Sequence, residues 1–72
     1  MPTVYVLHES IDLGSHVIGV FSSPEKLREA EELYRRYYAK IHPGQAPTLF
    51  MEENELNEIT IGYGARAERH VL

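Results

Sequence analysis

Two short apolar segments near the N-terminus predict a pair of β-strands. Residues 4–8, with the sequence Val-Tyr-Val-Leu-His, are rich in β-branched and aromatic side chains, and residues 16–21 have a similar composition. The polar stretch of seven residues between them contains Gly14, which suits a turn. A wide antiparallel hairpin is the simplest way to connect two strands across so few residues.

The strongest local signal marks the start of a helix at residue 24. Ser23 suits the N-cap position because its hydroxyl can accept a hydrogen bond from a free backbone N–H, and Pro24 suits the first helical position. Apolar and aromatic residues then recur at helical spacing and fall within an arc of about 140°. These residues are Leu27, Ala30, Leu33, Tyr34, Tyr37, Tyr38 and Ile41. We therefore predict a helix over residues 24–41 whose apolar face packs on the sheet.

Charges along this segment are ordered in a way that favours a helix. Acidic side chains lead and basic side chains follow, which complements the helix dipole. The leading residues are Glu25, Glu29, Glu31 and Glu32, and the following residues are Arg35, Arg36 and Lys40. Spacings of four between Glu and Arg also favour ion pairs on the helix surface.

The order of the remaining elements predicts the fold class. Pro43 ends the helix, residues 48–52 read as a third strand, and residues 59–63 could form a short fourth strand at an edge. A crossover helix after the second strand places the third strand beside the first, in sheet order 2-1-3. The prediction is an α+β fold, a two-layer ββαβ domain over residues 1–63 with one helix on one face of a mainly antiparallel sheet. Residues 64–72 are predicted to be a flexible tail.

Both faces of this predicted sheet are apolar, although one helix can cover only one of them. In a register in which His8 opposes His16, the uncovered face needs another partner, and a homodimer is the commonest remedy. The predicted interface consists of Tyr5, Leu7, Val17 and Phe21, with Phe50 as a further candidate. If the helix covers the other face, the interface is Val4, Val6, Ile18 and Val20.

Composition narrows the possible functions. The chain has 72 residues and no cysteine, so no disulfide can supplement a small core. Its net charge of −4 disfavours a nucleic-acid partner, which would require a basic surface. The N-terminus lacks the basic segment and the long apolar run of a signal peptide or membrane span. We therefore expect a cytoplasmic protein without a membrane partner.

Candidate chemistry is limited to two groups of residues. In the register above, His8 and His16 face each other with Cβ atoms about 5 Å apart, so they could share a Zn²⁺ or Ni²⁺ ion, or simply lie at a solvated hairpin end. The acidic cluster lacks the spacing of a calcium loop and fits a solvated edge. It consists of Glu52, Glu53, Glu55 and Glu58. No nucleophile, phosphate loop or cleft is indicated, and we predict no catalytic residue, cofactor or resident metal.

Three short motifs resemble those of a family of small bacterial and phage domains of unknown function. They are Val-Tyr-Val-Leu at residues 4–7, Gly-Val-Phe-Ser-Ser at residues 19–23 and Glu-Leu-Asn-Glu at residues 55–58. In that family a strand leads to a "GVYSS" segment and a helix, and a later strand ends near "ELDE". The resemblance covers about residues 3–58 and implies the fold above and an intracellular setting, but no activity.

The sequence thus favours a non-catalytic interaction or structural module that self-associates. One alternative is a phage-type or regulatory inhibitor that binds a larger host protein through its acidic surface. The other alternative is a metal site at His8 and His16.

Overall fold

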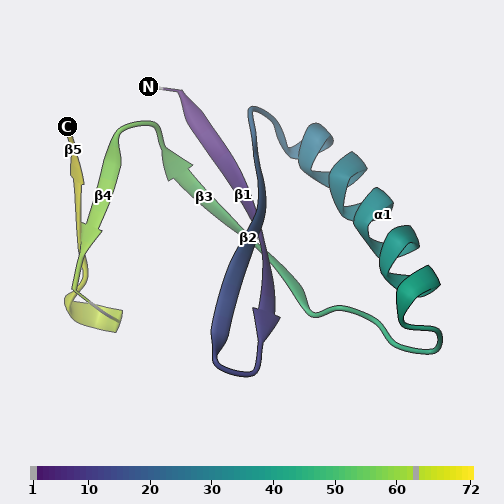
Figure 1. Ribbon diagram of the computed structural model, residues 1–72. Coiled ribbons are helices and arrows are strands. Elements are labelled where there is room, and N and C mark those ends of the chain that lie inside the picture. Colours follow the sequence, from purple (N-terminus) through teal and green to yellow (C-terminus); the bar gives the residue numbers. More distant parts are fainter. Residues whose placement is uncertain (1, 63) are drawn as a thin grey trace.

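The structure, a computed structural model, describes residues 2–62 and 64–72 (Figure 1). These residues form one α-helix, five strands and one short 3-10 helix. The elements follow in the order β1 (Thr3–Ile11), β2 (Gly14–Phe21), α1 (Pro24–Ile41), β3 (Leu49–Glu55), β4 (Glu58–Ile61), the short 3-10 helix η1 (Gly64–Arg66) and β5 (Glu68–Val71). In these residues, no helix combines the length and the apolar character that a membrane crossing requires.

The sheet topology confirms the predicted fold class. Strands β2, β1 and β3 form an antiparallel sheet in the order β2-β1-β3, and α1 packs on β1 and β2. The predicted fourth strand exists as β4, but it belongs to a separate two-stranded sheet with β5. Residues 64–72, which we expected to be a flexible tail, instead contain η1 and β5, and the backbone of β5 pairs with β4.

The register predicted for the first hairpin is wrong. Strands β1 and β2 continue through the polar stretch and meet at a tight turn of two residues, which Gly14 supports with a φ of 148°. A bulge next to Leu7 then shifts the pairing once more. His8 consequently opposes Val17, whereas His16 opposes Glu9. The predicted register assumed a seven-residue loop and no bulge, and the tight turn and the bulge each change which residues oppose one another.

The hydrophobic core is small and lies between α1 and β1. Leu7 and Leu27 are the buried leucines among the described residues, with 1% and 3% of their surface exposed, and Pro47 is also buried. The predicted cap of α1 is confirmed, since the Ser23 hydroxyl accepts a hydrogen bond from the backbone N–H of Lys26 at 3.3 Å. Helix α1 therefore begins where the sequence indicates, and it covers the sheet face that carries Leu7.

The sheet covers only part of the apolar face of α1. Tyr34 and Tyr38 are half-buried, but Leu33, Tyr37 and Ile41 are 64%, 61% and 51% exposed. These three residues lie on the side of the apolar arc that points away from β1. The arc of about 140° is wider than the contact that one helix makes with two strands.

The β4–β5 hairpin lies at the end of the molecule away from α1 (Figure 1). Its link to the first strand includes a hydrogen bond from Leu56 N–H to the Pro2 carbonyl at 3.0 Å. The molecule is consequently open, with extents of 42 × 27 × 14 Å. Its radius of gyration is 14.2 Å, compared with about 11 Å for a compact domain of this length.

Candidate functional site

An apolar groove runs between α1 and β2. It has a volume of about 420 Å³ and is lined by Ile18, Phe21, Ala30, Leu33, Tyr34 and Tyr37. The strand contributes Ile18 at the bulge and Phe21 at its end. Gly19 makes room for the Phe21 ring, because a Cβ atom at Gly19 would lie 2.7 Å from Phe21 Cζ. The groove is therefore a product of the local sequence of β2 as much as of the helix.

A second uncovered apolar surface lies on the opposite face of the three-stranded sheet. Val17, Val20 and Phe50 share this face and are 54%, 60% and 45% exposed. The His8 ring stacks on the Phe50 ring with centroids 4.7 Å apart, and His8 Nε2 lies 3.1 Å from a carboxylate oxygen of Glu52. The molecule thus presents two separate apolar surfaces, one on each side of the sheet.

The five residues predicted for an interface do not form one patch. Leu7, Tyr5 and Phe21 lie on the face that α1 covers, and Leu7 is part of the core. Val17 and Phe50 lie on the opposite face. The error follows from the register, because a shift of one residue exchanges the two faces of a strand.

The alternative set is also divided between the two surfaces. Val4, Val6 and Val20 lie on the open sheet face, whereas Ile18 lines the groove beside α1. No single set proposed from the sequence therefore describes either surface, and the interface itself stays a prediction.

A polar cluster that the sequence analysis missed joins the helix to the sheet. Oε1 of Glu9, a residue only 9% exposed, accepts a hydrogen bond from the Tyr34 hydroxyl and lies 2.8 Å from Nε2 of His16. The Tyr34 hydrogen bond, followed by His16, lowers the pKa of Glu9 below its usual value. The same bond raises the pKa of Tyr34 to about 12. The cluster ties α1 to β1 by a charge-assisted hydrogen bond.

The cluster predicts that stability falls at both extremes of pH. A lowered pKa means that Glu9 stabilises the fold above pH 4.5, its reference pKa, and that this contribution is lost as the pH falls through the folded-state pKa. A raised pKa means that Tyr34 contributes fully below pH 10 and loses this contribution between pH 10 and about 12.

Urea denaturation of the wild type and of Tyr34→Phe across this pH range provides the measurement. The difference in unfolding free energy between the two proteins should be largest at neutral pH and shrink at either extreme. A difference that does not change with pH would contradict the bond between Tyr34 and Glu9.

The predicted histidine pair is absent. His8 opposes Val17 and points to the open face, whereas His16 lies with Glu9 on the face that α1 covers. Within the described ranges, no group of three or more His, Cys, Asp and Glu side chains is placed to hold a metal ion. The hypothesis of a metal site shared by His8 and His16 is therefore wrong, since it depends on the incorrect register.

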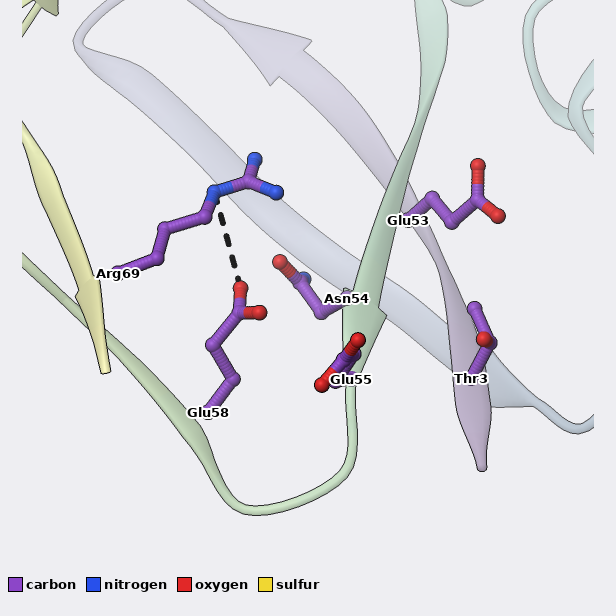
Figure 2. A pocket seen from close by; sticks show the side chains of 6 residues that line it. All are labelled: Thr3, Glu53, Asn54, Glu55, Glu58 and Arg69. Carbon is purple, nitrogen blue, oxygen red and sulfur yellow. Dashed lines mark ion pairs between the residues drawn. The ribbon is translucent and has the colours of Figure 1, made fainter. Parts of the chain in front are cut away.

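The predicted acidic cluster is divided between two places. Three of its members border a pocket of about 250 Å³ that Figure 2 shows between β3 and the β4–β5 hairpin; the pocket is lined by Thr3, Glu53, Asn54, Glu55, Glu58 and Arg69. There, Arg69 Nε lies 3.7 Å from Oε1 of Glu58 (Figure 2), and the Glu58 side chain is only 7% exposed. The fourth member, Glu52, contacts His8 on the open sheet face. Two of the four carboxylates are thus paired within the chain.

The three motifs of the family resemblance lie in a strand, at a helix cap and in a turn. The first lies in β1, the second joins β2 to the cap of α1, and the third spans the turn from β3 to β4. The turn includes Asn57, whose φ of 67° is in the left-handed region. Comparison of the chain with protein-family models, curated proteins and solved structures finds no significant match, so the resemblance stays a prediction.

Proposed function

We propose that this protein is a non-catalytic interaction module that self-associates through an uncovered apolar surface. Surface area is the observation that carries the proposal. The chain exposes 5711 Å², whereas a compact monomer of its mass exposes about 4,600 Å². The excess of about 1,100 Å² is comparable to the roughly 800 Å² that each partner buries in an interface of standard size.

The small core supports the same proposal. Two buried leucines, Leu7 and Leu27, with the buried Pro47, make a small core for a chain with no disulfide. Burial of more apolar surface against a second copy would stabilise each chain by mass action. We assign no catalytic residue, because Glu9 already accepts a hydrogen bond from Tyr34 and contacts His16, and these contacts join the helix to the sheet.

An inhibitor that binds another protein through an acidic surface has less support. Glu58 forms an ion pair with Arg69 at 3.7 Å, although its Oε1 accepts no hydrogen bond from the described residues, and Glu52 lies 3.1 Å from His8. Both carboxylates thus already face a basic side chain of the same chain. The remaining carboxylates at the pocket, on Glu53 and Glu55, form a weaker charged surface than the sequence indicates.

Sedimentation equilibrium over a range of micromolar concentrations tests the proposal. We expect a dimer whose midpoint of thermal unfolding rises with protein concentration. A monomer of 8.3 kDa at every concentration, with a midpoint that does not change, would overturn self-association.

A further inference from the structure

The exposed side of α1 carries a ridge between two grooves. Leu33, Tyr37 and Ile41 are spaced four apart and form the ridge, and each is at least half exposed. On one side lies the apolar groove of about 420 Å³ beside β2. On the other side, a smaller groove of about 360 Å³ is lined by Leu33, Arg36, Tyr37, Ala39 and Lys40. A ridge flanked by grooves is the shape by which two helices interlock.

Charges beside this ridge are arranged for an antiparallel partner. At 100° per residue, Glu25, Glu29, Arg36 and Lys40 all lie on the polar side of Leu33. Glu29 and Arg36 have the same midpoint in the sequence as Glu25 and Lys40, between residues 32 and 33. A two-fold axis at that midpoint would place Glu29 opposite Arg36 of a second copy and Glu25 opposite Lys40 of a second copy. Each pair would occur twice.

These charges have weak competition within the chain. Glu29 contacts Lys26 at 3.2 Å, but both side chains are more than 60% exposed, and such pairs contribute little. Among the described residues, no ion pair engages Arg36 or Lys40. Arg36 and Lys40, which lie beside the ridge, are therefore available to a partner with an acidic helix.

We infer that α1 pairs antiparallel with α1 of a second copy, so that the ridge of each helix enters the groove between α1 and β2 of the other. This inference rests on the proposed self-association and names its surface. The open sheet face is the competing surface. The open sheet face carries one carboxylate, Glu52, which contacts His8 of the same chain. A two-fold axis on that face therefore brings no comparable set of opposite charges together.

Two charge-reversed chains test the pairing. Glu25→Lys/Glu29→Lys makes all four of the flanking charges named above basic. Arg36→Glu/Lys40→Glu makes all four of them acidic. Each variant alone faces like charges, and we expect its dimer to dissociate at least about tenfold more readily than the wild type at low ionic strength. An equimolar mixture should restore a dimer that contains one chain of each kind. Sedimentation measures the mass, and circular dichroism verifies the fold.

Asp12→Lys/Glu68→Lys provides the matched control, because it changes the net charge as much as the first variant does. Asp12 lies in the hairpin turn, Glu68 lies in β5 at the end of the molecule away from α1 (Figure 1), and both are exposed. This control should dimerise like the wild type. If it is weakened as much as the ridge variants, or if the mixture does not restore dimers, the helix pairing is wrong.

The outcomes separate this inference from the proposed function. A monomeric wild type overturns both. A dimeric wild type whose ridge variants dimerise equally well overturns only the helix pairing and places the contact on another surface, with the open sheet face as the next candidate.

Discussion

Replacement of Leu7 by alanine is expected to leave most of the protein unfolded at room temperature. Leu7 is 1% exposed and packs between the sheet and α1, where the other buried leucine is Leu27. A buried Leu→Ala change costs roughly 2–5 kcal/mol, and a core of this size rarely supplies more than about 3–5 kcal/mol. Far-ultraviolet circular dichroism with urea denaturation measures the loss.

Leu33→Ala is the matched control, because it removes the same atoms from a side chain that is 64% exposed. In dilute solution, where the chain is monomeric, we expect a change of at most about 0.5 kcal/mol in the free energy of unfolding, since alanine is also a good helix former. Equal losses at Leu7 and Leu33 would mean that the core does not lie where the structure places it.

The helix and the strand order could be predicted because local and topological signals agree. Ser23 and Pro24 set the start of α1, and the segment at Pro43 sets its end. A strand, a helix and another strand in succession leave few alternatives for the sheet order. These signals lie within a few residues of one another, so no knowledge of distant contacts is required.

The faces of the sheet could not be predicted because they depend on two small features of one hairpin. Neither the tight turn before Gly14 nor the bulge at Ile18 has a distinct sequence signal, yet both change which residues oppose each other. The facing of His8 and His16 and the grouping of the predicted interface residues on one face depended on that register and are wrong with it. The strand β5 was missed for a related reason, since Glu68–Val71 is short, exposed and largely polar.

The polar cluster at Glu9 could not be predicted for a different reason. A glutamate beside a predicted turn normally indicates a solvated loop, but here it is nearly buried because Tyr34, which is 25 positions away, supplies a hydrogen bond. A buried carboxylate is stable only with such partners. The partner becomes evident only when the position of α1 on the sheet is known, so no local pattern could identify the cluster.

Replacement of Tyr34 by aspartate is expected to unfold the protein at neutral pH. The change removes the hydroxyl that donates to Glu9 and places a second carboxylate near the first, beneath α1. Leaving a buried carboxylate without its hydrogen-bond donor costs roughly 1–3 kcal/mol or more, and burial of a second carboxylate of the same charge adds to that cost. Below pH 4.5 the penalty should decrease, because protonation of either carboxyl removes the repulsion.

Tyr37→Asp provides the control, since the same substitution three residues later falls on a side chain that is 61% exposed. The isolated chain should keep its fold, with a change in unfolding free energy within about 1 kcal/mol. The same variant should fail to dimerise, because an aspartate would stand on the ridge that the pairing buries. Thermal unfolding separates the two variants, because only Tyr34→Asp should lose its fold. Sedimentation of the folded Tyr37→Asp variant then tests the contact, and it should show a monomer. If Tyr37→Asp unfolds the dilute protein as completely as Tyr34→Asp does, α1 is rotated from its position here, and both the contact with Glu9 and the exposed ridge are wrong.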